Sequence, residues 1–232
     1  MQKQFILLNM ENYRIFDSEL DKLRDRVFQM SVQVNRQLID VVAAMNTGDL
    51  QLVKKIIDND AEINNLDTKI DKLCQKIFAL QHPVASDLRY IMSSLKINND
   101  LERIGDHAVN IAKRIGTLLD YPHLVDELGL DNIGSKTLEL FADVLSLISS
   151  LDITFADKIL DKADKIDIDC KKIISKIFKE MLHQPDVVEV SANILIIINL
   201  FERVASYSTN IAEAISFVVD GEIIKHKKRN DN

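Results

Sequence analysis

The apolar residues of this chain recur with the spacing of an amphipathic helix. Isoleucine occupies every seventh position from 56 to 77, and leucine follows the last three isoleucines by three residues: Ile56, Ile63, Ile70, Ile77 and Leu66, Leu73, Leu80. This spacing places one apolar stripe along a helix, which a helical bundle buries. The same seven-residue spacing returns at Ile159, Ile166 and Ile173. The pattern predicts long helices that pack against one another.

Turn-forming residues divide the chain into six predicted helices. Glycine and proline stop helices, and the residue before a proline is biased away from helical geometry. The first helix is expected from about Glu11 to Asn46-Thr47-Gly48, the second ends at His82-Pro83, and the third ends at Tyr121-Pro122. The fourth is expected from about Ser135 to Leu151, the fifth ends before Gln184-Pro185, and the sixth ends at Asp220-Gly221.

An internal repeat groups these helices into two sets of three. Residues 99–112 align with residues 199–212, and polar positions agree as well as apolar ones: Asn99/Asn199, Glu102/Glu202, Arg103/Arg203, Asn110/Asn210, Ile111/Ile211 and Ala112/Ala212. Helical periodicity alone would not make the polar residues agree. We predict an all-α fold of two tandem three-helix bundles, at residues 11–122 and 133–221, with a linker at 123–132 and a basic tail at 222–232.

Composition supports the helical interpretation and excludes several functions. The 232 residues include only 6 glycines and 3 prolines, too few for the turns of a β-rich protein. A net charge of −7 disfavours nucleic-acid binding, which needs a basic surface. The basic run at 225–229 is interpreted as a solvated tail, with weak attraction to an anionic membrane as the alternative.

The sequence also indicates a cytoplasmic location. Its longest apolar run, residues 194–198, is far shorter than the roughly 20 residues that a membrane span needs. Residues 1–10 lack the long apolar core of a signal peptide. Cys74 and Cys170 are isolated from each other, which fits neither a disulfide framework nor a zinc site and favours a reducing compartment.

Oxygen-bearing side chains line one face of the second and third predicted helices. Glu102 and Asp106 are four residues apart and share a helix face, where like charges repel. The second helix carries a comparable line of Asp60, Asn64, Asp67 and Asp71. If the two helices pack antiparallel, the lines meet, and such oxygens suit a hard cation, or iron or manganese. The alternative is a solvated acidic face on which Arg103 pairs with Asp106.

Signatures of catalysis are sparse. One Glu-x-x-His occurs, at Glu180 and His183, whereas a di-iron carboxylate site requires two such motifs and two further glutamates. The sequence contains neither a Gly-rich phosphate loop nor a Gly-x-Ser-x-Gly. We therefore expect a protein that is not an enzyme, with a carboxylate-bridged metalloenzyme as the alternative.

Four segments together resemble the PhoU family of phosphate-uptake regulators. They are Pro-Val-Ala-Ser-Asp-Leu-Arg at 83–89, Leu-Glu-Arg-Ile-Gly-Asp-His-Ala at 101–108, Asn-Ile-Ala at 110–112, and Asp-Asn-Asp-Ala-Glu-Ile-Asn-Asn-Leu at 58–66. The likeness extends over nearly the whole chain, including its duplicated layout, and its residue-level match is better in the first half.

The resemblance implies bound metal ions. A first site, for iron, manganese, magnesium or zinc, would use Asp60, Asn64, Glu102 and Asp106. Asn64 stands where many members have aspartate, which removes a charge but keeps an oxygen donor. A weaker second site would use Asp167 and Glu202, because Ala163 and Ser206 occupy two positions where an acid is expected.

The resemblance also implies a role and partners. Members lower phosphate import and silence the phosphate-starvation response, as adaptors between a phosphate ABC transporter, at its ATPase subunit, and a sensor histidine kinase. Membrane association would then occur only through these partners. A homodimer is expected because long amphipathic helices often leave apolar surface to share.

Overall fold

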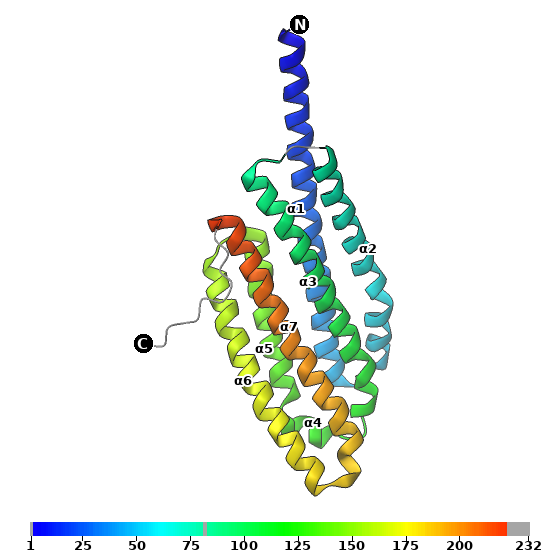
Figure 1. Cartoon of the computed structure of the whole chain (residues 1–232). Helices are drawn as coiled ribbons and strands as arrows, with labels where there is room; N and C mark the ends of the chain where they lie inside the picture. Colours follow the sequence, from blue (N-terminus) through cyan, green and yellow to red (C-terminus); the bar gives the residue numbers. More distant parts are fainter. Residues whose placement is uncertain (1, 81–82, 222–232) are drawn as a thin grey trace, which may run out of the picture.

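The chain folds into helices joined by short turns (Figure 1). This computed structural model describes residues 2–80 and 83–221, with side chains from Phe16 onward, and within those ranges there is no strand. The α-helices are α1 (Gln2–Thr47), α2 (Leu50–Leu80), α3 (Ala85–Ile115), α4 (Pro122–Leu128), α5 (Leu130–Ser150), α6 (Thr154–His183) and α7 (Val188–Asp220). Two 3₁₀ turns, η1 (Gly116–Leu118) and η2 (Pro185–Val187), complete them. The all-α prediction is confirmed.

The long helices form two three-helix bundles that pack side by side. Each of α1, α2 and α3 contacts the other two, and so does each of α5, α6 and α7. Across the bundles α1 contacts α5 and α3 contacts α7. In Figure 1 α3 runs downward while α7 runs upward, so the two helices are antiparallel. The two copies of the repeat are therefore related by an approximate two-fold axis, and the predicted tandem bundles are confirmed.

The isoleucine stripes form the cores of the bundles. Ile56, Ile63, Ile70 and Ile77 of α2 are all at most 3% exposed, and the corresponding isoleucines of α6 are buried too. Leu66 and Leu73 are also buried, as the seven-residue pattern predicts. Leu80 is 67% exposed because it is the last residue of α2.

The segment that joins the bundles is more ordered than its sequence suggests. Residues 122–128 form α4, whose Leu124 and Leu128 are buried, and α5 begins at Leu130 rather than near Ser135. Gly129 separates the two helices with a left-handed φ of 69°, which glycine adopts without strain. At the other end of the first bundle, α1 begins at Gln2 rather than near Glu11, since no glycine or proline interrupts the intervening residues.

Gly134 lies inside α5 instead of in a turn. A Cβ built at this position would lie 3.0 Å from Cγ1 of Val42 in α1. The glycine is therefore needed for the close approach of the two bundles, and not for backbone flexibility.

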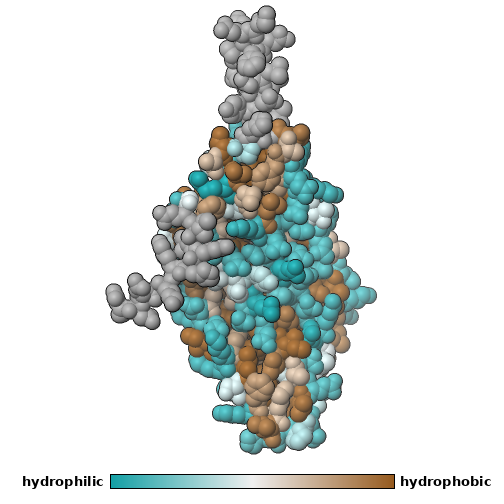
Figure 2. Space-filling view, viewed as in Figure 1, coloured by the Kyte–Doolittle hydropathy of each residue, from teal (hydrophilic) through white to brown (hydrophobic). Residues whose placement is uncertain are grey.

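Exposed apolar side chains gather where the second and third helices of each bundle meet. We call these two groups the hairpin tips; the first consists of Phe78, Leu80, Val84, Leu88 and Met92, and the second of Phe178, Leu182 and Val188. Phe78 and Phe178 are one repeat apart, as are Leu88 and Val188. Figure 1 places the α2–α3 and α6–α7 turns at opposite ends of the molecule, and Figure 2 shows apolar surface towards both ends.

The structure bears on the expectation about membrane spans but not on the one about the basic tail. No helix among the described residues is both long enough and apolar enough to span a membrane. The basic run at 225–229 falls outside the described residues, so its interpretation as a solvated tail stays a prediction.

Candidate functional site

Acidic and amide side chains meet along the line where α2 packs against α3. We call this group the acidic seam; it consists of Asp60, Asn64, Asp67 and Asp71 from α2 and Asn98, Glu102 and Asp106 from α3. Within each helix the members are three or four residues apart and share one face. The two predicted lines of oxygen donors thus lie on neighbouring helices of the same bundle.

Asn98 links the two helices of the seam. Its side chain is 1% exposed, and its Nδ2 donates hydrogen bonds to Oδ1 of Asp67 at 2.7 Å and to Oδ1 of Asp71 at 3.1 Å. Asn64 Nδ2 donates to Oδ2 of Asp60 at 3.1 Å. Asn98 was not predicted as a site residue. The feature of the sequence that could have drawn attention to it is an amide placed directly after Ile97, which the structure shows to be buried.

The carboxylates of the seam act on one another electrostatically. Burial raises the pKa of Glu102, and the charge of Asp106 raises it further, with smaller contributions from Asp67 and Asp60. Arg103 opposes this rise, with its Nε 3.7 Å from Oε2 of Glu102. Arg103 therefore pairs with Glu102, and not with Asp106 as the solvated-face alternative expected. The carboxylates of the seam therefore repel one another, and Arg103 offsets their negative charge only in part.

Asp67 shows the same effect. Burial raises the pKa of this carboxyl, Asp71 adds to the rise, and the hydrogen bond from Asn98 opposes it. A cation placed among these groups would relieve both the burial and the repulsion of their charged forms.

The residue types of the seam fit a hard cation, and their arrangement fits it in part. Oδ1 of Asp60 is buried without a hydrogen-bond partner, as expected for an oxygen that could accept a cation. Asp60, Glu102 and Asp106 are close enough for their charges to couple. Over the described ranges, however, no three His, Cys, Asp or Glu side chains are arranged to hold a metal ion. Binding would require side chains to turn toward a common point.

Lysines neutralise the corresponding region of the second bundle. Asp167 pairs with Lys171 at 2.6 Å, and Asp169 pairs with Lys136 at 2.6 Å and Lys172 at 2.9 Å. Ala163 is buried, and Ser206 is exposed on α7. The weak second site at Asp167 and Glu202 stays a prediction, in surroundings where lysine already supplies the counter-charge.

Both residues of the Glu-x-x-His motif form local contacts at the C-terminal end of α6. Glu180 Oε2 accepts a hydrogen bond from Gln184 Nε2 at 3.2 Å, and Nδ1 of His183 lies 2.7 Å from the carbonyl oxygen of Lys179. Both contacts are local to the last turn of the helix. Cys74 and Cys170 are buried, and burial raises the pKa of each thiol to about 12, which suppresses the reactive thiolate.

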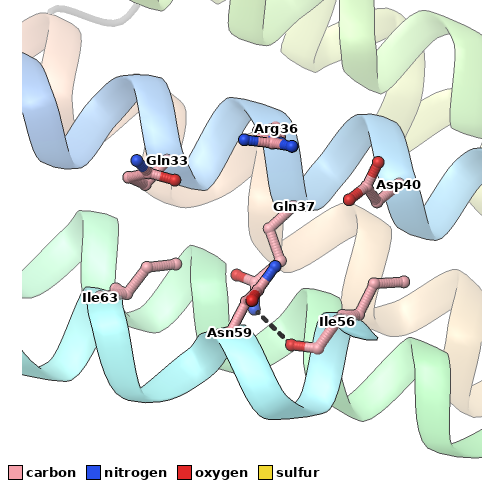
Figure 3. A pocket seen from close by; sticks show the side chains of 7 residues that line it. All are labelled: Gln33, Arg36, Gln37, Asp40, Ile56, Asn59 and Ile63. Atoms are coloured by element: carbon pink, nitrogen blue, oxygen red, sulfur yellow. Dashed lines mark hydrogen bonds between the residues drawn. The ribbon is translucent and has the colours of Figure 1, made fainter. Parts of the chain in front are cut away.

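Two cavities border the first bundle. A cavity of about 10 Å³ between α1 and α2, room for a single water molecule, is lined by Gln33, Arg36, Gln37, Asp40, Ile56, Asn59 and Ile63 (Figure 3). Gln37 Nε2 donates there to the carbonyl of Ile56 at 3.3 Å. A hollow of about 450 Å³ lies among the α1–α2 turn, η1, α4 and α5. Neither lining brings a nucleophile and a base together.

Equivalent positions of the repeat meet where the two bundles touch. The rings of His107 in α3 and Tyr207 in α7 lie 5.6 Å apart between centroids, tilted by 41°. Burial lowers the pKa of His107 to about 4, and the charges of Arg203 and Arg103 act in the same direction. Nearby, burial raises the pKa of Asp100 to about 6, although a hydrogen bond from Asn210 opposes the rise.

Comparison with known proteins matches one family twice. The model of the PhoU domain matches residues 27–115 and 130–215, which cover both bundles. The phosphate-specific transport system accessory protein PhoU of Escherichia coli is 30% identical over 91% of this chain and 88% of its own length. The protein of the same name from Serratia marcescens is 29% identical over 91% of this chain and 87% of its own length.

Solved structures agree with the sequence comparison. The crystal structure of PhoU from Pseudomonas aeruginosa superposes with a TM-score of 0.85 at 30% identity, covering 89% of this chain and 100% of that one. The phosphate transport system regulatory protein PhoU from Streptococcus pneumoniae superposes with a TM-score of 0.81 at 29% identity, over 91% of this chain and 100% of that one.

Proposed function

Because this chain belongs to the PhoU family, we propose that it is a negative regulator of phosphate uptake and of the phosphate-starvation response. The observation that carries the proposal is the double family match, which covers both bundles. The named relatives are accessory and regulatory proteins of phosphate transport systems, so the chain belongs with non-enzymatic regulators.

The regulator acts by contact in this proposal. Its partners are the ATPase subunit of a phosphate ABC transporter and a sensor histidine kinase, which it meets in the cytoplasm. The two hairpin tips support a contact mechanism, because exposed clusters of large apolar side chains commonly mark surfaces that bind other proteins.

Deleting the gene is expected to derepress phosphate-starvation genes in cells grown with ample phosphate. The reason is that the proposed regulator holds the kinase and the transporter in their phosphate-replete state. Transcript levels of those genes are measured in the deletion strain and after the wild-type gene is returned. Transcript levels that do not change on deletion would mean that the chain has the family's fold without its role.

We also propose that the acidic seam binds a cation, either iron or a divalent ion such as Mn²⁺, Mg²⁺ or Zn²⁺. The ligands are Asp60, Asn64, Glu102 and Asp106. Support comes from the mutual repulsion that raises the pKa of Glu102 and from the unpaired buried oxygen of Asp60. A bound cation neutralises these charges and holds α2 and α3 together, which stiffens that face of the bundle.

The double variant Glu102→Gln/Asp106→Asn is expected to lose the metal that the wild-type protein retains. Removing two carboxylates removes most of the charge that attracts the cation. Metal content is measured on protein purified without chelators and without a histidine tag, together with the rise in melting temperature on adding Mn²⁺. The matched control is Glu62→Gln, which makes the same chemical change at an exposed position of α2 outside the seam and should keep the metal.

Equal metal content in the double variant and the wild-type protein would refute the metal proposal. The same variants returned to the deletion strain show whether the seam matters for repression. Restored repression by the metal-free double variant would make the metal dispensable for that role.

A further inference from the structure

Gln37 is a polar side chain deep inside the first bundle. It is 4% exposed on α1, and its Nε2 donates a hydrogen bond to the carbonyl oxygen of Ile56 in α2 at 3.3 Å. This bond fixes the orientation of the amide, because the reversed amide would bring two oxygens together. The other end of the amide, Oε1, is buried without a hydrogen-bond partner in the part of the chain that the structure describes. Buried acceptors normally have a partner, so Oε1 requires a donor.

The amide of Gln37 also reaches the third helix of the bundle. A Cβ built at Gly105 in α3 would lie 3.2 Å from Oε1, so the glycine leaves the room that the amide occupies. Thr137 and Ala205 stand 100 residues further along, at the offset of the repeat, and both are buried. Thr137 Oγ1 donates to the carbonyl oxygen of Ile133 at 2.8 Å, so its hydroxyl has a partner within α5. The long amide with its unpaired oxygen therefore belongs to the first bundle.

The small cavity between α1 and α2 lies beside this amide (Figure 3). Its volume is about 10 Å³, and Gln37 is one of the residues that line it. A cavity holds one water molecule when it offers roughly 10–15 Å³ and two to four polar partners. Besides Gln37, polar side chains line it from both helices: Gln33, Arg36 and Asp40 from α1 and Asn59 from α2. The cavity is too small for an organic ligand and polar enough for water.

We propose that this cavity binds a single water molecule that donates a hydrogen bond to Oε1 of Gln37. The other polar side chains of the lining take the remaining hydrogen bonds of the water. The ligand is neutral and is able to donate and to accept, which a buried amide oxygen beside mixed polar groups requires.

The water would complete a contact of α1 with both helices of the acidic seam. The carbonyl of Ile56 belongs to the helical turn that ends at Asp60, because it accepts the backbone N–H four residues later. Gly105 belongs to the turn of α3 between Glu102 and Asp106. The hydrated amide of Gln37 thus supports these two turns from α1. This inference depends neither on the proposed regulatory role nor on bound metal.

The test is a high-resolution crystal structure of the whole chain, determined at cryogenic and at room temperature. A water peak is expected about 2.7–3.2 Å from Oε1 of Gln37 at both temperatures. The peak should disappear in Gln37→Met, which keeps the length of the side chain and removes the amide. The control is Gln29→Met, which makes the same change at an exposed position of α1 and should keep the peak.

Nuclear magnetic resonance gives a second measurement in solution. Nuclear Overhauser effects between water and the methyl groups of Ile56 and Ile63, which line the cavity, are expected in the wild-type protein. They should be lost in Gln37→Met and kept in Gln29→Met. Thermal melts establish that each variant is folded. If Gln37→Met does not fold, the wild-type peak and the wild-type Overhauser effects decide the question.

Three results would overturn the proposal. The first is a wild-type cavity without a water peak and without Overhauser effects to water. The second is a direct hydrogen bond to Oε1 from the guanidinium of Arg36 or the amide of Asn59. The third is a water that stays in place, unchanged, when Gln37 is replaced by methionine.

Discussion

Replacing Asp100 with asparagine is expected to stabilise the folded protein by about 2–3 kcal/mol at pH 7. Asp100 is only 8% exposed, and burial raises its pKa from 3.8 to about 6. The folded state therefore holds the proton more tightly than the unfolded state does. Asparagine keeps the shape and an oxygen that accepts the hydrogen bond from Asn210, but it carries no charge to bury.

The effect depends on pH in a defined direction. A carboxyl whose folded pKa is raised contributes fully to stability below its unfolded pKa of 3.8, and that contribution is lost as pH rises through about 6. The advantage of the Asp100→Asn variant should therefore be large at pH 7 and shrink toward pH 4. Urea unfolding of both proteins across this range measures it.

Asp58→Asn is the matched control for Asp100→Asn. It makes the same chemical change at an exposed position of α2, and it should have little effect on unfolding at any of these pH values. An Asp100→Asn variant that is less stable than wild type at pH 7, or equally changed at pH 4 and pH 7, would contradict this account of the buried carboxyl.

Leucine at Gly134 is expected to destabilise the protein by about 3 kcal/mol, toward the upper end of what overpacking a close contact costs. A Cβ alone would already lie 3.0 Å from Cγ1 and 3.1 Å from Cγ2 of Val42, and 3.4 Å from Cε of Met45. The rest of the leucine side chain has no room unless α5 moves away from α1. Denaturant unfolding gives the loss in stability.

Gly116→Leu provides the comparison for Gly134→Leu. A Cβ at Gly116 would meet nothing within 4 Å, and the backbone there is already right-handed, with φ of −56°. The same side chain should then cost little. If the two leucine variants unfold at the same denaturant concentration, the bundles are not held as closely at Gly134 as the structure describes.

The overall architecture was predictable because its signals are local or repeated. The isoleucine spacing of α2 and α6 identified the buried faces, and the Glu-Arg and Asn-Ile-Ala agreements revealed the duplication. Glycine was harder to interpret. Gly129 does end a helix, whereas Gly134 is required by a contact with Val42, a residue about 90 positions earlier that no local pattern identifies.

The acidic seam was predictable in composition but not in detail. Helical spacing was enough to place Glu102 beside Asp106, whereas bringing both near Asp60 required the further premise that the two helices pack antiparallel. The role of Asn98, by contrast, depends on how α3 is rotated against α2, which decides that its amide faces Asp67. The contact between His107 and Tyr207 likewise depends on how the two bundles pack, which no local pattern in the sequence identifies.

The hairpin tips give the duplicated chain a property that a single bundle would lack. Phe78 and Phe178 occupy the same position in the two repeats, yet the antiparallel arrangement sends them to opposite poles. Under the proposed contact mechanism such a molecule has two separate docking poles, because a protein docked at one pole leaves the other pole open. One copy of the chain then bridges two proposed partners that never touch each other, and the response of each becomes tied to the local abundance of the other.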